Sequence, residues 1–400
     1  MTTPAGHQSL HRLLAELHDL GRSDRTGGYH RFAWTDVDAE LSEWFAAKAI
    51  ERGLDHTVDR AGNQWAWWGD PDRAPGTGLV TGSHLDSVPD GGPLDGPLGV
   101  VSAFAAVDAL LATGHRPSRP IGIVNFRDEE GARFGVACAG SRLVTGILDP
   151  QRALGLRDAS GISLAEAMIR YGHRAGDVAR DREALARVGT FVELHVEQGR
   201  GLADLDRPVA VGTSIVPHGR WRLELDGEAN HAGTTRLRDR RDPMLTLAGV
   251  IQAARSAAES ADCVATVAKV SVQPNGVNAI PSRVTAWLDA RGGRESAVRG
   301  VAAEVAAAAG TDPVEESFTT STDFDARLAV MLARWLDDAP LLSTGAGHDA
   351  GILSTTGVPT AMLFVRNPTG VSHSPLEHAE PEDCEAGVDA LTDVLRRMTR

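Results

Sequence analysis

The sequence lacks the marks of several protein classes. Its three cysteines, Cys138, Cys263 and Cys384, are far apart and form no CxxC pair, which argues against a disulfide framework or a cysteine zinc site. The net charge is −14 and no basic run occurs, which argues against nucleic acid or an anionic membrane as a partner. No stretch approaches about 18 uninterrupted apolar residues, and residues 1–10 lack a signal-peptide pattern. We expect a cytoplasmic protein with a small-molecule partner.

Length and residue pattern predict two domains. A chain of 400 residues exceeds what one hydrophobic core usually serves. Strand, helix and strand alternate over 79–126, which is typical of a βαβ unit in a mostly parallel sheet. A strand-rich stretch from 209 to 314 contains two helices, one over 295–309 and one capped by Asp242. The sequence therefore predicts an α/β fold with an inserted α+β domain.

Apolar spacing predicts the other elements. A hairpin is expected from 55–59 and 63–68, and we interpret its three tryptophans, Trp65, Trp67 and Trp68, as packing rather than as a ligand box. Helices are expected at 7–20, at 36–50 with Asp36 as the cap, and at 97–112, 326–336 and 381–396. One further strand is expected at 360–365.

One stretch, residues 81–100, combines polar side chains with turn residues. An apolar run at 78–81 leads into His84 and Asp86, which would share one face of a strand because they are two apart. A turn then delivers Asp95 immediately before a helix. A histidine near a loop is more often an ordinary polar residue than a ligand, so this stretch alone is weak evidence for a metal site.

Further polar residues follow other predicted strands and strengthen the case. Glu129 and Glu130 follow an apolar strand at 121–126, His195 lies near the end of another, and His373 lies near the C-terminus. Open α/β sheets build their sites at the carboxyl ends of strands. Serine hydrolase chemistry is disfavoured, because no GxSxG turn accompanies Ser83 or Ser141.

These motifs resemble the metal-dependent M20 peptidase and amidohydrolase family. Within it, the chain is similar to the branch of allantoate amidohydrolases, N-carbamoyl-L-amino acid hydrolases and β-ureidopropionases, over nearly its whole length. The resemblance implies a di-metal catalytic domain from 1–212 and 329–400, and a lid and dimerisation domain from 213–328. It rests on TGSHLDSVPDGGPLDG at 81–96, DEEG at 128–131, FVELHVEQ at 191–198, HAGTT at 231–235 and SHS at 372–374.

The resemblance implies two divalent ions per subunit, zinc or manganese, with cobalt or nickel as alternatives. Mixed imidazole and carboxylate shells accept any of these metals. Asp95 would bridge the two ions, and Asp86 would hold the imidazole of His84 in place. The five implied metal ligands are His84, Asp95, Glu130, His195 and His373.

The two adjacent glutamates are expected to have different tasks. Neighbouring side chains at a strand end face opposite ways, so Glu129 and Glu130 cannot both bind one ion. By resemblance, Glu130 is the ligand and Glu129 is the general base that passes a proton to the leaving nitrogen. The family also implies that His231 polarises the substrate carbonyl from the lid of a partner subunit, which predicts a homodimer with a shared site.

Substrate recognition is expected from Gln198, Asn278, Arg291 and Gly345. Arg291 has a planar guanidinium that suits a substrate carboxylate, and it, like Asn278, would come across the dimer interface. The chain departs from the family beside the site, with Arg236-Leu237 after the HAGTT motif and Pro93-Leu94 before Asp95. Arg366 could meet a second acidic group on the substrate.

The sequence predicts an amidohydrolase that cleaves a linear amide or ureido C–N bond of a small carboxylate. Allantoate is the first expected substrate and an N-carbamoyl-L-amino acid the next. An N-formyl- or N-acyl-amino acid deacylase, for example one acting on N-formylglutamate, and a dipeptidase remain open. A non-catalytic binding protein on the same fold is a further alternative, which the complete set of expected ligands disfavours.

Overall fold

The computed structural model describes residues 3–400 and divides them into two compact units. Unit 1 comprises the chain up to Thr213 and again from Asp323 onward, and unit 2 comprises Ser214–Thr322. The catalytic and lid functions expected for the two parts of the chain stay predictions.

The centre of unit 1 is a nine-stranded sheet whose middle strands are parallel. Strands β4, β3, β5 and β15 run in one direction, whereas β2 and β6 flank them in antiparallel pairing. Strands β3, β4 and β15 are buried along their whole length, as expected for strands covered on both faces. The order is β1 (Asp55–Val58), β2 (Gln64–Trp68), β4 (Ile121–Phe126), β3 (Gly78–His84), β5 (Val188–Val196), β15 (Thr360–Val365), β6 (Val209–Ile215) and β13 (Thr322–Asp323), with β14 (Leu341–Thr344) paired to β6.

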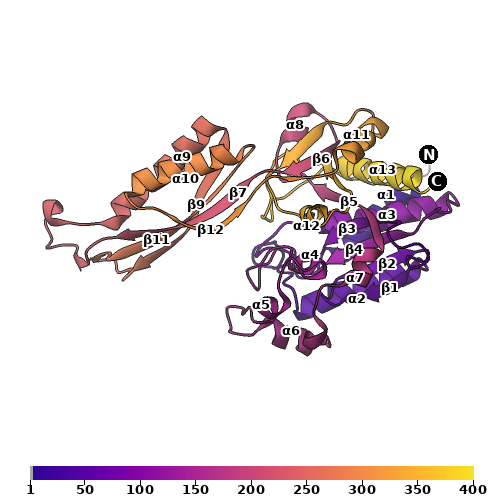
Figure 1. Ribbon diagram of the computed structural model, residues 1–400, viewed down its shortest axis with the longest axis horizontal. Helices are drawn as coiled ribbons and strands as arrows, with labels where there is room; N and C mark the ends of the chain where they lie inside the picture. The colour runs from indigo at the N-terminus through magenta and orange to yellow at the C-terminus, as the bar shows by residue number, and fades with distance from the viewer. Residues whose placement is uncertain (1–2) are drawn as a thin grey trace. The chain divides into compact units, whose positions relative to one another are not determined.

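Helices cover both faces of this sheet. Alternate residues of β15, such as Ala361 and Leu363, join the main core, in which α1, α3 and α13 pack side by side (Figure 1). This core also takes in α2 and α11. Helix α12 packs against β5 and β15 and contacts α4. The helices are α1 (Ala5–Leu17), α2 (Asp36–Glu51), α3 (Pro97–Ala112), α4 (Ala139–Thr145), α5 (Pro150–Leu154), α6 (Leu164–Arg170), α7 (Arg182–Ala186), α8 (Gly201–Leu205), α11 (Ala326–Trp335), α12 (Asp349–Thr355) and α13 (Pro381–Met398), with the 3-10 turn η1 (Ala175–Asp177).

The local predictions are mostly confirmed. The hairpin of β1 and β2 exists, and Trp65 and Trp67 are buried and stacked on each other as packing residues. The predicted cap of α2 is wrong by one residue, because the side chain of Thr35, not that of Asp36, accepts from the backbone N–H of Asp38.

Unit 2 is an antiparallel sheet with two helices. The sheet has the order β12 (Val314–Thr319), β7 (His218–Asp226), β11 (Arg283–Gly292) and β9 (Cys263–Gln273). Helices α9 (Pro243–Ala261) and α10 (Glu295–Ala309) lie side by side and share one hydrophobic core with it (Figure 1). Asp242 caps α9 as predicted. A short pair, β8 (Asn230–His231) and β10 (Ala279–Ile280), and the 3-10 turn η2 (Leu237–Asp239) complete the unit.

Two expectations from the sequence, one about membrane spans and one about disulfides, can be compared with the structure of residues 3–400. Within that range, no helix is long and apolar enough to span a membrane. All three cysteines are free thiols, and two of them, Cys138 and Cys384, are buried.

The main core depends on Phe104 of α3. Its ring is fully buried and packs against the rings of Trp44 and Phe45 of α2. We expect Phe104→Ala to lower the free energy of unfolding by about 3–5 kcal/mol, because it leaves a cavity between α2 and α3. Leu111→Ala, on the exposed last turn of α3, should change it by only about 0.5 kcal/mol. Equal losses in urea denaturation would contradict this assignment.

Candidate metal centre

The parallel strands bring the candidate ligands to one edge of the sheet. His84 is the last residue of β3, and His195 is the penultimate residue of the neighbouring β5. Glu129 and Glu130 follow β4, which pairs with β3 on the other side. Because parallel strands end at the same edge, these side chains gather there.

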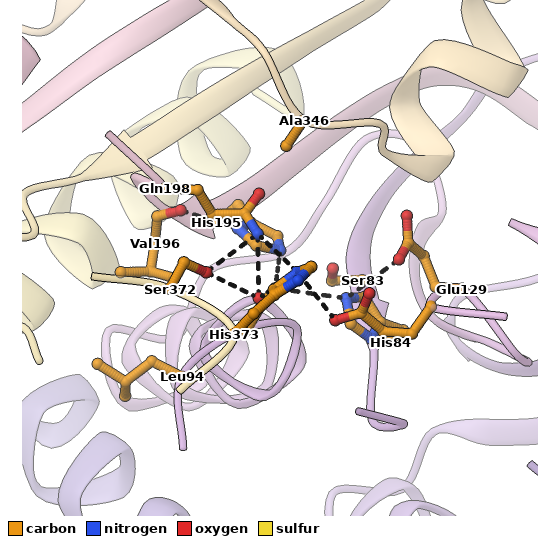
Figure 2. Close-up of polar contacts among 12 residues, drawn as sticks. Ser83, His84, Leu94, Glu129, His195, Val196, Gln198, Ala346, Ser372 and His373 are labelled. Atoms are coloured by element: carbon orange, nitrogen blue, oxygen red, sulfur yellow. Dashed lines mark hydrogen bonds and ion pairs between the residues drawn. The ribbon is translucent and has the colours of Figure 1, made fainter. Parts of the chain in front are cut away.

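Two groups of potential ligands share one carboxylate. The first group is His84, Asp95 and His195, and the second is Asp95, Glu130 and His373. Within each group, the ligand atoms lie within 4.8 Å of one another. The Oδ1 atom of Asp95 is 3.3 Å from Nε2 of His195, and its Oδ2 atom is 3.4 Å from Nε2 of His373. Figure 2 shows the three histidine rings converging on this centre.

The buried histidines are oriented as metal ligands would be. Nδ1 of His195 lies 2.9 Å from the backbone oxygen of Val196, and Nδ1 of His84 lies 3.1 Å from that of Asp86. Each Nδ1 can therefore carry the ring proton, which leaves the Nε2 lone pair free. Both Nε2 atoms are buried and have no hydrogen-bond partner among residues 3–400. A divalent ion would satisfy them, so the residues present fit a metal.

Glycine is required where the Asp95 loop meets α3. Gly96 has φ of +87°, which side chains disfavour, and a Cβ there would lie 2.4 Å from the ring of His84. This close approach lets Asp95 and His84 belong to one group.

Asp86 has a larger task than the sequence predicts. One carboxylate oxygen lies 3.4 Å from Nδ1 of His84, as expected for a residue that holds this ring. The two oxygens also accept hydrogen bonds from the backbone N–H groups of Glu129, at 3.1 Å, and Glu130, at 3.0 Å. Asp86 therefore fixes the turn that presents both glutamates.

The two glutamates occupy different surroundings. Glu130 belongs to the group of Asp95 and His373, whereas Oε2 of Glu129 lies 3.8 Å from Nε2 of His84. Burial raises the pKa of Glu129 well above its usual value, although His84 opposes this. Burial and the charge of Asp95 raise the pKa of Glu130 to about 8. Both carboxyl groups can thus hold a proton near neutral pH in the absence of a cation.

His348 ends the Gly-rich loop 345–348, which we expect to line the pocket through backbone groups, and its side chain also belongs to the site. It occupies the N-cap position of α12 without a side-chain capping hydrogen bond, and the centroid of its buried ring lies 4.5 Å from that of His195. Together with Glu193 and His195 it forms a third group of potential ligands. Burial and the neighbouring His195 lower the pKa of His348 well below its usual value, which keeps the ring neutral. Glu193 and His195 are two residues apart on one strand and so share a face of it. This pattern in the sequence could have indicated a further group of polar side chains there.

The predicted substrate residues of unit 1 have mixed positions. The amide of Gln198 donates to Oδ2 of Asp95 at 3.0 Å and to the hydroxyl of Ser372 at 3.2 Å. Gly345 follows β14, and Figure 2 shows the adjacent Ala346 pointing toward the ligand cluster. The guanidinium of Arg366 donates to two protein carboxylates, those of Asp383 and Asp206, and its suggested role toward the substrate stays a prediction.

The other predicted site residues lie in unit 2. His231 in β8 is opposite Ala279 in β10. The backbone oxygen of Asn278 accepts from the backbone N–H of Ala232, the residue after His231, at 2.9 Å. His231 and Asn278 are therefore neighbours. Arg291 lies near the end of β11 and donates to the carboxylate of Asp289 at 2.8 Å.

The sequence profile of Peptidase family M20/M25/M40 matches residues 80–397. The chain belongs to this family. It is 36% identical to the N-carbamoyl-L-amino acid amidohydrolase of Geobacillus stearothermophilus, over 98% of each chain. It is 32% identical to the allantoate amidohydrolase of Bacillus subtilis strain 168, over 93% of each chain. A solved hydantoinase/carbamoylase-family amidase from Burkholderia vietnamiensis matches it with a TM-score of 0.86 at 28% identity, over 100% of this chain and 99% of that one.

These similarities confirm the predicted family, the α/β fold class and the reaction class. The M20/M25/M40 protein described here is a metal-dependent amidohydrolase that acts on a C–N bond other than a peptide bond. Its buried clusters of histidine and carboxylate side chains provide candidate sites for that metal.

The contacts of Asp86 make a prediction about metal affinity. We expect Asp86→Ala to weaken divalent-metal binding about 10- to 100-fold, because it releases His84 and the turn of Glu129 and Glu130. Asp90→Ala is the matched control, since this carboxylate on the same loop is more exposed and bonds Thr26 and His30 instead. Titration calorimetry with a divalent metal would compare the affinities of the two variants. Equal affinities would refute the role of Asp86.

Proposed function

We propose that this amidohydrolase cleaves a ureido C–N bond, with allantoate as the first candidate substrate and an N-carbamoyl-L-amino acid as the next. The observation that carries the proposal is the double ligand group with Asp95 in common. The similarity to an N-carbamoyl-L-amino acid amidohydrolase and to an allantoate amidohydrolase supports the substrate class.

We propose that the cluster holds two divalent ions, zinc or manganese, with cobalt or nickel as alternatives. His84 and His195 would hold one ion, Glu130 and His373 the other, and Asp95 both. When bound, such ions supply Lewis-acid activation of water and of the scissile carbonyl. Mixed nitrogen and oxygen ligands suit each of these metals.

Glu129 is the proposed general base. The thiol of Cys138 donates to its Oε1 atom at 3.1 Å, while Oε2 faces His84 and the ligand cluster. A carboxylate at this position can take up a proton at Oε2 and deliver it to the leaving nitrogen. The carboxylate therefore takes one proton from water and delivers it to the product amine.

Two histidines are proposed to act on the substrate carbonyl oxygen. His348, held neutral beside His195, can donate a hydrogen bond from within unit 1. His231 would donate from a partner subunit, and Asn278 and Arg291 would accompany it. This arrangement requires a homodimer, which we propose together with a cytoplasmic location, in keeping with the free cysteines.

Arg291 is the proposed reader of the substrate carboxylate, since a guanidinium can bind it in a bidentate way. Gln198 would have two tasks. Its amide nitrogen holds Asp95, and its Oε1 atom, without a partner among the described residues, can accept from a substrate N–H. Gly345 would line the same pocket through its backbone.

The proposal is tested by the products of hydrolysis. The Mn²⁺- or Zn²⁺-loaded protein is offered allantoate and N-carbamoyl-L-amino acids, with ammonia release measured, and N-formylglutamate, with formate release measured. We expect kcat/KM for one of the ureido substrates to exceed that for N-formylglutamate by orders of magnitude. Preferred turnover of the formyl compound would favour the N-acyl-amino acid deacylase alternative. No turnover of any of them would contradict the proposed substrate class.

The roles of the adjacent glutamates are tested separately. Glu129→Gln should keep its bound metal but lose nearly all turnover, because the amide cannot take up the proton. Glu130→Gln should instead lose metal from the His373 side. Metal content by mass spectrometry and kcat are measured for both variants. If Glu129→Gln loses metal while Glu130→Gln stays active, the assignments are reversed.

A further inference from the structure

Glu377 lies four residues after His373 and has a buried side chain, 5% exposed. Its Oε2 atom accepts two backbone hydrogen bonds, from the N–H of Leu94 at 2.8 Å and from that of Asp95 at 3.0 Å. Its Oε1 atom is 3.3 Å from the hydroxyl of Ser372. The carboxylate therefore contacts both loops that carry ligands of the second group, the Asp95 loop and the His373 loop.

The contact between these two loops is closely fitted. A Cβ at Gly92 would lie 2.3 Å from Oε2 of Glu377 and 2.5 Å from its Cβ, so only glycine leaves room for the carboxylate. The hydroxyl of Ser372 also lies 3.1 Å from Oδ2 of Asp95. Glu377 thus reaches Asp95 in two ways. It accepts directly from the backbone N–H of Asp95, and it contacts the carboxylate of Asp95 through the hydroxyl of Ser372.

We propose that Glu377 is a positioning residue that clamps the Asp95 loop to the His373 loop and so sets the affinity of the metal site. The inference rests on the proposed function in taking this cluster as the metal centre. Asp95 and His373 both lie on loops, and each would lose conformational freedom when an ion binds. A carboxylate that orders both loops beforehand removes part of that cost, as residues behind metal ligands commonly do.

Two substitutions at 377 separate the clamp from the charge. Glu377→Ala removes all three contacts, and we expect Mn²⁺ affinity to fall about 10- to 100-fold, with activity restored by excess Mn²⁺ and KM then unchanged. Glu377→Gln keeps a carbonyl oxygen for the two N–H groups, and its amide can donate to Ser372. It should bind Mn²⁺ nearly as tightly as the wild type.

Gly92 provides an independent route to the same effect. Gly92→Ala should displace the carboxylate of Glu377 and weaken Mn²⁺ binding without removing any charge. In a double variant with Glu377→Gly, which removes the whole side chain including its Cβ, the clash is absent, so adding Gly92→Ala should cause little further loss. Such non-additivity is expected only for two residues that act through one contact.

Asp181→Ala is the matched control for loss of a buried carboxylate. Asp181 accepts backbone hydrogen bonds from Glu183 and Ala184 at the start of α7, away from the candidate ligands in sequence and in contacts. The Asp181→Ala substitution should lower the melting temperature and leave the Mn²⁺ affinity unchanged. Titration calorimetry with Mn²⁺ measures all variants after folding is verified by circular dichroism.

The outcomes distinguish the inference from the function it rests on. Wild-type affinity in a folded Glu377→Ala variant, or equal loss in Glu377→Ala and Glu377→Gln, would overturn the clamp alone. A wild-type protein that binds neither Mn²⁺ nor Zn²⁺ would overturn the proposed function and the clamp together.

Discussion

The carboxylate of Asp95 is the contact on which the rest of the site depends. It lies against His195 and His373 and accepts from Gln198, while its own backbone N–H is held by Glu377. Burial alone would raise the pKa of Asp95, but the contact with His195 and the nearby histidine charges lower it below its usual value. A permanently ionised carboxylate at the centre of several imidazoles is what two cations in close proximity require.

The fold delivers this arrangement through strand direction. Because β3, β4 and β5 are parallel neighbours, His84, Glu129 and His195 reach the same edge of the sheet although they lie far apart in the sequence. The side chains of His84, Glu129 and His195 are buried at that edge. Burial then favours a proton on Glu129 and a neutral His348, and an acid–base group and a neutral donor follow from the same desolvation.

Local sequence signals predicted much of this structure, but they did not predict contacts between residues that are far apart in the chain. The bounds of α10 and β15 follow from apolar spacing and agree with the structure, and the ligand candidates follow from polar residues at strand ends. The contact of Glu377 with Asp95 spans 282 positions, and the pairing of Arg366 with Asp383 depends on how α13 packs. No local pattern encodes such contacts, so the role of Glu377, the side-chain role of His348 and the protein partners of Arg366 were not predicted.

The central claim is that Asp95 is common to two metal sites, and a count of bound ions tests it most directly. The number of Mn²⁺ or Zn²⁺ ions per chain is measured by native mass spectrometry for the wild type, Asp95→Ala and His373→Ala. The account predicts two ions in the wild type, none in Asp95→Ala and one in His373→Ala. Loss of only one ion in a folded Asp95→Ala variant would contradict it, since the two sites would then be independent.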